Sequence, residues 1–155
     1  MKKILILGAG LSTISLIDYL LRNAEENNWQ ITLGDIDEEM AKKKVNGSDY
    51  GTAISFDIND EEFAKNSIKN HDVVISMLPA FMHMKVVEKC IEFKKPMLTA
   101  SYATPEIKAM HQQAQDAGIP IIMELGVDPG IDHMSAMHVI NRIRKEGGDL
   151  QSFYK

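Results

Sequence analysis

The order of segments in the first 35 residues constrains this chain more than any other feature. A short apolar run at 3–7, rich in strand formers, breaks at a glycine turn (8–10), and helical periodicity follows over 11–21. A second apolar run at 30–34 ends at Asp35. Glycines in such a turn let backbone N–H groups approach a pyrophosphate, and a carboxylate about 20 residues further on holds the adenosine ribose. The order therefore predicts a dinucleotide-binding unit.

The glycine turn departs from the full dinucleotide fingerprint at one position. The fingerprint has a third glycine, whereas this loop reads Gly8-Ala9-Gly10-Leu11-Ser12-Thr13. A glycine pair alone is a weak signal. The flanking strands, the helix and Asp35 make nucleotide binding the favoured interpretation.

Composition limits the class of protein. The 155 residues correspond to about one domain, and a net charge of −5 without a basic, aromatic-interleaved cluster argues against a nucleic-acid partner. No run approaches the roughly 20 apolar residues of a membrane span, and the apolar start is too short for a signal peptide. Cys90 is the only cysteine, which fits a reducing compartment. We expect a cytoplasmic protein that binds neither nucleic acid nor membrane.

Strand and helix signals alternate along the rest of the chain. Further strands are expected at 52–56, 72–78, 96–99 and 119–123. Helices are expected at 38–45, 81–93, 105–117 and 131–145, and another follows residues 57–60 and ends at Ile68. In the expected strands apolar residues follow one another instead of alternating with polar ones, which is typical of strands buried on both faces of a sheet. The predicted fold class is α/β, a Rossmann-type, doubly wound parallel sheet of about six strands.

Ligands of such sheets bind outside the carboxyl ends of the strands. The segments expected to line one crevice are 8–13, Asp35, 78–79, 99–102 and 124–132. The bend at 128–130 precedes a helix and is expected to leave backbone N–H groups for an anion or a nicotinamide amide. Asp132 falls in the first turn of that helix, where we expect a structural cap rather than a catalyst.

Three of these segments make the sequence similar to a known family. They are Leu78-Pro79 with His83, Cys90-Ile91 and Lys95; Thr99-Ala100-Ser101-Tyr102; and the run Glu124-Leu125-Gly126-Val127-Asp128-Pro129-Gly130-Ile131-Asp132-His133-Met134. In order and spacing they resemble the saccharopine dehydrogenases, more narrowly the glutamate-forming branch, also called saccharopine reductase. The resemblance implies a Rossmann domain that binds NAD(P) and helps to hold a saccharopine-like amino acid. It also implies a reversible oxidation of saccharopine to L-glutamate and 2-aminoadipate 6-semialdehyde, in lysine metabolism.

The resemblance further implies roles for individual residues. Cofactor contacts fall on Gly8, Gly10, Leu11, Ser12, Thr13, Asp35, Asp57, Ile58, Leu78, Pro79, Val127, Asp128 and Pro129. Substrate contacts fall on Ser101 and Tyr102. Tyr102 and Asp128 are the catalytic candidates, the first as a hydrogen-bonding partner of substrate or water and the second as support for a developing iminium. A structural tyrosine and a turn-forming aspartate are the alternative interpretations.

The choice between NAD and NADP depends on the residues that follow the second strand. Asp35 should repel a 2′-phosphate and accept two ribose hydroxyls, which favours NAD. Asp37 is a second candidate acid, and Lys42, Lys43 or Lys44 could reach a 2′-phosphate. Parts of the family use NADP, so NAD is expected and NADP remains possible.

Other reactive side chains carry no catalytic prediction. His83, His111, His133 and His138 show no metal-ligand pattern, so no metal is expected. We expect His83 to be a cap or packing residue, and Cys90 to be an inert buried thiol.

A substrate with three carboxylates should be gripped by arginine forks. The chain has only Arg22, Arg142 and Arg144, on predicted helices away from the crevice. Full-length members of the family continue into a second domain, so 1–150 is expected to be the NAD(P)-binding domain and 151–155 the start of an absent substrate domain. The domain alone should then be inactive, and a homodimer is possible. The alternatives are a carboxynorspermidine- or opine-type dehydrogenase and a non-catalytic NAD(P)-binding regulatory module.

Overall fold

A computed structural model describes residues 1–152 of the chain. The described strands are β1 (Lys2–Leu7), β2 (Trp29–Asp35), β3 (Gly51–Ser55), β4 (Val73–Ser76), β5 (Met97–Leu98) and β6 (Ile121–Ile122). The helices are η1 (Leu11–Thr13), α1 (Ile14–Arg22), α2 (Ala24–Asn27), α3 (Glu38–Val45), α4 (Glu61–Lys69), η2 (Ala80–Met82), α5 (His83–Glu92), α6 (Pro105–Ala109), α7 (His111–Ala117) and α8 (Ile131–Lys145).

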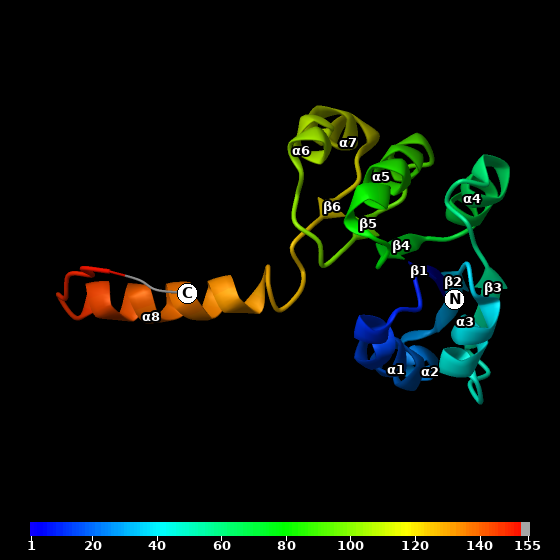
Figure 1. The fold of residues 1–155 in the computed structure, drawn as a ribbon, viewed down its shortest axis with the longest axis horizontal. Helices are drawn as coiled ribbons and strands as arrows, with labels where there is room; N and C mark the ends of the chain where they lie inside the picture. Colours follow the sequence, from blue (N-terminus) through cyan, green and yellow to red (C-terminus); the bar gives the residue numbers. More distant parts are fainter. Residues whose placement is uncertain (153–155) are drawn as a thin grey trace.

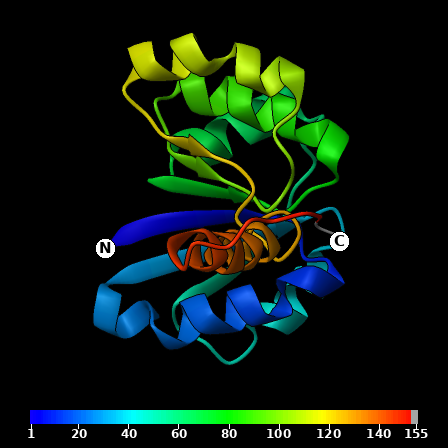
Figure 2. The ribbon, with the colours of Figure 1, turned by 90° about the vertical axis from the view of Figure 1, so that its left-hand side faces the viewer.

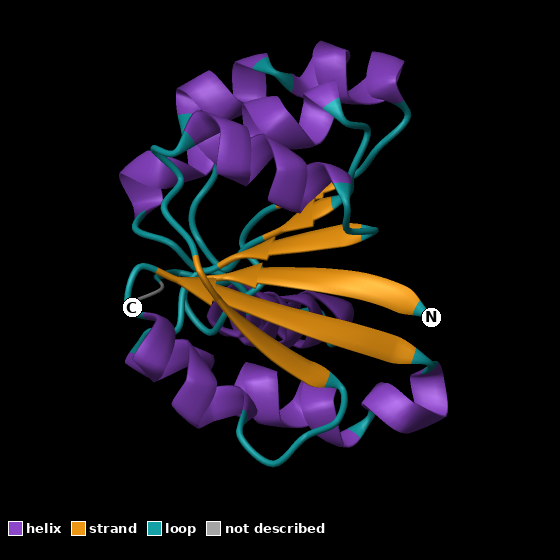
Figure 3. Cartoon of the chain, turned by 90° about the vertical axis from the view of Figure 1, so that its right-hand side faces the viewer, coloured by secondary structure: helices purple, strands orange, loops and turns teal. Residues whose placement is uncertain are grey.

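The six strands form one parallel sheet in the order β3-β2-β1-β4-β5-β6. Figure 3 shows the strands fanning out with helices on both faces. The chain moves outward from β1 to β3, then returns to the other side of β1 to continue with β4. This reversal places a crevice between the carboxyl ends of β1 and β4, where such folds bind ligands. The predicted six-stranded, doubly wound α/β fold is confirmed.

Alternate side chains of β1 enter the two separate hydrophobic cores. Ile4 and Ile6 pack with α1 and α3 on one face, and Leu5 and Leu7 pack with α4 and α5 on the other. Figure 2 shows these two helical layers on opposite sides of the sheet. Burying an aliphatic side chain of this size stabilises a fold by about 1.5–3 kcal/mol. The central strand therefore anchors both layers and holds the glycine turn at its end.

Several local predictions differ from the structure. The strand expected at 72–78 covers only Val73–Ser76, and the helix expected over 11–21 begins with the separate turn η1. The helix expected at 105–117 is divided into α6 and α7 at Met110, whose N–H bonds the carbonyl of Ile107. This three-residue bond tightens the turn and interrupts the α-helical ladder. Strands β5 and β6 contain two residues each, shorter than expected, and each begins directly after a proline, Pro96 or Pro120, which has no N–H for the sheet.

Helix α8 has the predicted bounds but no buried residue. Figure 1 shows it projecting from the sheet. Asp132 in its first turn and basic residues in its last turn complement the helix dipole. No described helix is long and apolar enough to cross a membrane. The start of a further domain, expected at 151–155, falls largely on 153–155, outside the described residues.

Candidate nucleotide and substrate site

The glycine turn leaves β1 in a conformation that suits a ligand. Gly8 has a φ of +103°, and a Cβ there would lie 2.7 Å from the carbonyl oxygen of Met77. No atom lies within 4 Å of a Cβ placed on Gly10. Gly8 is thus required by the close approach of the β4 end, whereas Gly10 borders open space. A pyrophosphate could approach the backbone at Gly10, which is the fit that a dinucleotide requires.

Asp35 lies directly beside this turn. Its Oδ2 accepts a hydrogen bond from the Ala9 N–H at 2.6 Å, and its Oδ1 accepts one from the Asp37 N–H at 2.9 Å. Asp37, the second candidate acid, caps α3 by accepting the N–H groups of Glu39 and Met40. Since each carboxylate oxygen has more than one acceptor site, Asp35 can still receive ribose hydroxyls. The geometry favours Asp35 over Asp37 as the ribose acid.

Thr13 occupies the position of the missing third glycine and is fully buried. Its Oγ1 donates to the Gly10 carbonyl at 2.7 Å. Lys44 Nζ, from α3, donates to the same carbonyl and to Thr13 Oγ1, the latter at 3.0 Å. Burial lowers the pKa of the Lys44 ammonium, and the Asp35 carboxylate opposes that shift. A side chain that the sequence suggested for a 2′-phosphate is instead bonded to the turn.

Lys42 also has local partners. Its Nζ lies 3.0 Å from Glu38 Oε1 and 2.9 Å from Glu39 Oε1, both on α3. These exposed pairs place Lys42 on a solvated face of α3.

A cavity of about 400 Å³ joins four of the predicted segments. Its lining includes Ser12 from the glycine turn, Leu78 after β4, Ser101 and Tyr102 after β5, and Asp128 before α8. The parallel sheet brings these segments together because their strands all end at the same edge. Two larger hollows, of about 510 and 770 Å³, are lined by none of the residues to which the resemblance gives a cofactor, substrate or catalytic role, although Lys43 and Lys44 line the larger one.

The two catalytic candidates are in direct contact. Tyr102 donates a hydrogen bond from its hydroxyl to Asp128 Oδ1 at 2.6 Å, across 26 residues of sequence. Tyr102 is 54% exposed and Asp128 is also exposed, so the pair is accessible to a ligand. The contact brings together two residues that the resemblance selected independently.

His83 connects the ends of β4 and β5 beneath this cavity. It is 1% exposed, and hydrogen bonds join its Nδ1 to Ser76 Oγ at 2.9 Å and its Nε2 to Ser101 Oγ at 2.6 Å. Burial lowers the pKa of its imidazole, which favours the neutral ring. The packing role expected for His83 agrees with this burial. Its link to Ser101 was not predicted, since partners 7 and 18 residues away leave no local sequence signal.

The expectation for the bend at 128–130 is wrong. The Gly130 N–H donates to Asp132 Oδ1 at 3.0 Å, and the Ile131 and Asp132 N–H groups donate to the carbonyls of Gly126 and Val127. These three N–H groups are therefore not left for an anion, because the loop folds back on itself and supplies their acceptors. The capping role of Asp132 is confirmed by the same bond.

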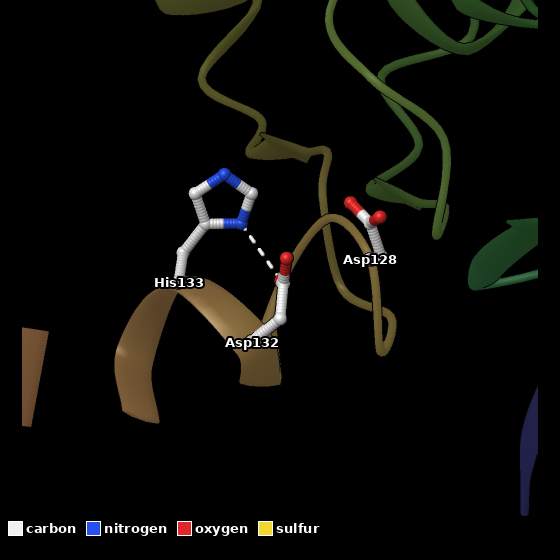
Figure 4. A group of neighbouring side chains, drawn as sticks. All are labelled: Asp128, Asp132 and His133. Atoms are coloured by element: carbon white, nitrogen blue, oxygen red, sulfur yellow. Dashed lines mark hydrogen bonds and ion pairs between the residues drawn. The ribbon is translucent and has the colours of Figure 1, made fainter. Parts of the chain in front are cut away.

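The start of α8 also brings together three possible metal ligands. Ligand atoms of Asp128, Asp132 and His133 lie within 4.8 Å of one another, and Asp132 Oδ1 is 2.7 Å from His133 Nδ1. Figure 4 shows Asp128 on the preceding loop and the other two on the first helical turn. Spacing along the chain did not reveal this grouping. Its Asp132–His133 bond and the Asp132 cap account for part of the arrangement without a metal.

Of the cofactor candidates, four line the cavity of about 400 Å³: Ser12, Leu78, Asp128 and Pro129. Leu11 and Pro79 lie beside the lining in sequence but are not part of it, and neither are Asp57, Ile58 and Val127. Ile58 is 2% exposed and belongs to the core, while Asp57 binds the backbone N–H of Asn59 through its side chain. Val127 is 73% exposed. Cys90 is buried, and burial raises the pKa of its thiol to about 12, as expected for an inert thiol.

The sheet order, the glycine turn and the acid after β2 define a Rossmann-type domain of the dinucleotide-binding class. The family model described as "Saccharopine dehydrogenase NADP binding domain" matches residues 4–122, and the chain belongs to this family. The predicted family and nicotinamide cofactor class are thereby confirmed.

Individual relatives agree with this assignment. Saccharopine dehydrogenase [NADP(+), L-glutamate-forming] of Pyricularia oryzae is 36% identical over 152 residues, which cover 98% of this chain and 33% of the relative. Mitochondrial alpha-aminoadipic semialdehyde synthase of Mus musculus is 39% identical over 155 residues, covering 98% and 16%. The apo structure of saccharopine dehydrogenase (L-Glu forming) from Saccharomyces cerevisiae superposes with a TM-score of 0.86 at 32% identity, covering 98% and 33%. The chain thus spans a third or less of these relatives.

Proposed function

We propose that this chain serves as the nucleotide-binding domain, over residues 1–150, of an enzyme that oxidises saccharopine reversibly to L-glutamate and 2-aminoadipate 6-semialdehyde. The observation that carries the proposal is the cavity in which Ser12 of the glycine turn lies with the Tyr102–Asp128 pair. A nucleotide on the turn and a substrate at the pair would then be neighbours. The names of the fungal relatives support the same reaction.

The proposed roles divide between the two sides of the crevice. Backbone at Gly8–Thr13 would receive the pyrophosphate, and Asp35 would accept the ribose hydroxyls. When bound, the nicotinamide supplies the hydride acceptor for oxidation or the donor for the reverse reaction. Ser101 and Tyr102 would bind the substrate, and the remaining candidates, including Leu78-Pro79, Asp57-Ile58 and Val127–Pro129, would contact the nucleotide.

Asp128 and Tyr102 would act on the charge that develops at the substrate nitrogen. Oxidation of a secondary amine produces a cationic iminium, which a nearby carboxylate stabilises electrostatically. The Tyr102 hydroxyl orients that carboxylate and stands where it could position the water that completes hydrolysis. Asp128 would thus stabilise the cation electrostatically and Tyr102 would orient the Asp128 carboxylate, while the cofactor carries out the redox step.

We also propose that this chain prefers NAD to NADP, although the family description and the fungal relatives name NADP. The Asp35 carboxylate beside the turn would repel a 2′-phosphate. Lys42 and Lys44, two of the three cations that could compensate, are bonded to Glu38, Glu39 and the turn. A cytoplasmic location and a homodimer remain predictions about the protein as a whole.

The test is calorimetric titration of the chain with NADH and NADPH. We expect NADH to bind at least about tenfold tighter, equivalent to about 1.4 kcal/mol, and Asp35→Ala to remove the difference. Asp37→Asn is the matched control, since asparagine preserves the helix cap while removing a neighbouring charge. Tighter binding of NADPH by the unaltered chain would contradict the NAD preference. Failure of both nucleotides to bind at millimolar concentration would contradict the nucleotide site itself.

A further inference from the structure

Three hydrogen bonds converge on a single carbonyl of the glycine turn. The Gly10 oxygen accepts the Thr13 N–H at 3.2 Å, the Thr13 hydroxyl at 2.7 Å and the Lys44 ammonium. Lys44 is the only one of these donors that comes from outside the turn, across 34 residues of sequence. Its bond is charge-assisted, the stronger kind of hydrogen bond.

The direction of this carbonyl determines the direction of the next N–H. In a trans peptide the C=O of Gly10 and the N–H of Leu11 lie in one rigid plane and point in opposite directions. Donors that hold the carbonyl against α3 therefore turn the Leu11 N–H away from α3. Leu11 opens η1 at the exposed start of the first helix, where dinucleotide turns present N–H groups to a pyrophosphate.

The anchor for Lys44 is itself rigid. Ala41 and Val45 on the same helix are buried in the core with Ile17 of α1. The fixed helix places the Lys44 side chain beside Thr13, and Thr13 Oγ1 accepts its second hydrogen bond at 3.0 Å. A glycine at position 13, as in the full fingerprint, would offer no such acceptor. Thr13, which replaces the third glycine of the fingerprint, and Lys44 therefore form one hydrogen-bonded unit.

We propose that Lys44 is a positioning residue for nucleotide binding: through the Gly10 carbonyl it orients the Gly10–Leu11 peptide toward the pyrophosphate, with Thr13 as its partner. The inference rests on the proposed nucleotide site and deepens it. It assigns Lys44 to the pyrophosphate that NAD and NADP share, rather than to the 2′-phosphate.

The experiment compares Lys44→Met with Lys43→Met, an exposed neighbour on the same helix, by titration of the chain with NADH and NADPH. We expect Lys44→Met to weaken both nucleotides by about three- to tenfold, the usual effect of one hydrogen bond, and Lys43→Met to leave the affinity for NADH, which has no 2′-phosphate, within about twofold. Adenosine has no phosphate, and its binding, followed by NMR at the Ala9 and Asp35 amides, should be unchanged in both variants. A general loss of structure would weaken adenosine as well.

Two further variants test whether Lys44 and Thr13 act together. Lys44→Arg keeps a cationic donor and should restore part of the affinity. Thr13→Val removes the hydroxyl at nearly constant volume, and its combination with Lys44→Met should lose less affinity than the product of the two single effects, because the residues act as one unit.

The outcomes separate the positioning role from the nucleotide site. If the unaltered chain binds NADH and Lys44→Met binds it equally well, the role of Lys44 is overturned while the nucleotide site stands. A loss confined to NADPH would also overturn it, since Lys44 would then contact the 2′-phosphate. If the unaltered chain binds neither nucleotide, the proposed function fails and the role of Lys44 fails with it.

Discussion

The two sides of the crevice are built by different means. On the side of β1 and β2, backbone groups determine the geometry: Gly8 adopts a positive φ, and Ala9 donates its N–H to Asp35. On the side of β4 and β5, side chains determine it, through His83 with Ser101 and through Tyr102 with Asp128. Under the proposed function, the nucleotide, which is common to many enzymes, would be met mainly by backbone, whereas the substrate, which differs between enzymes, would be met by side chains. The geometry of the first side can therefore be predicted from local sequence, whereas the geometry of the second side cannot.

This contrast can be tested through the stability of the chain, beginning with the largest effect. Gly8→Ala should lower the free energy of unfolding by about 3 kcal/mol, because the alanine would combine a strained φ with a Cβ 2.7 Å from the Met77 carbonyl. Denaturant unfolding measures the loss. Gly10→Ala is the matched control, with no atom within 4 Å of the new Cβ, and should cost less than about 1 kcal/mol. Equal losses in the two variants would contradict the backbone account of this side.

On the side of β4 and β5, His83→Ala should have an intermediate effect on the free energy of unfolding. It should cost about 1–3 kcal/mol, since the substitution leaves a buried Ser76 hydroxyl without its partner. His83→Gln, which can retain a hydrogen bond toward Ser101, should lose less. An alanine variant as stable as the unaltered chain would show that the buried network contributes nothing to the fold.

The same imidazole predicts a pH dependence. Burial lowers the pKa of His83 below its unfolded value of about 6.5, so its contribution to stability is fully present above that value and falls as the pH drops toward the folded pKa. Burial also lowers the pKa of His71, which therefore acts in the same direction. Each histidine adds at most about 1.4 kcal/mol per pH unit. The free energy of unfolding, measured from pH 7 to pH 5, should show this decline. His83→Gln should make the decline less steep, and the part that His71 contributes should remain.

Tyr102→Phe should have the smallest effect on folding. Its bond to Asp128 is exposed, and its loss should change the free energy of unfolding by less than about 1 kcal/mol and NADH affinity by less than about twofold. In the saccharopine-oxidising enzyme that we propose, the same change should lower kcat by about 10- to 100-fold, because the carboxylate would lose its orientation. Unchanged kcat there would indicate a structural tyrosine, and no activity in the unaltered enzyme would favour a regulatory module.

Much of the nucleotide side could be predicted from the sequence. The glycine turn, Asp35 and the alternation of apolar runs are local patterns, and each follows from backbone geometry that residues close in sequence determine. The bounds of α8 were likewise predicted, because a Gly-containing bend, Asp132 and terminal basic residues are local signals. The break at Met110 was missed, since a single three-residue turn has no compositional mark.

The sequence by itself determined the fold class and the family, and it limited the candidate ribose acids to Asp35 and Asp37. Only the tertiary structure decided which side chains meet: Lys44 with Thr13, His83 with Ser101, and Tyr102 with Asp128. It also decided that the N–H groups of the bend before α8 are used internally. The physical reason is that backbone conformation depends on neighbouring residues, whereas contacts across 18 to 31 residues depend on where the parallel sheet places the ends of its strands.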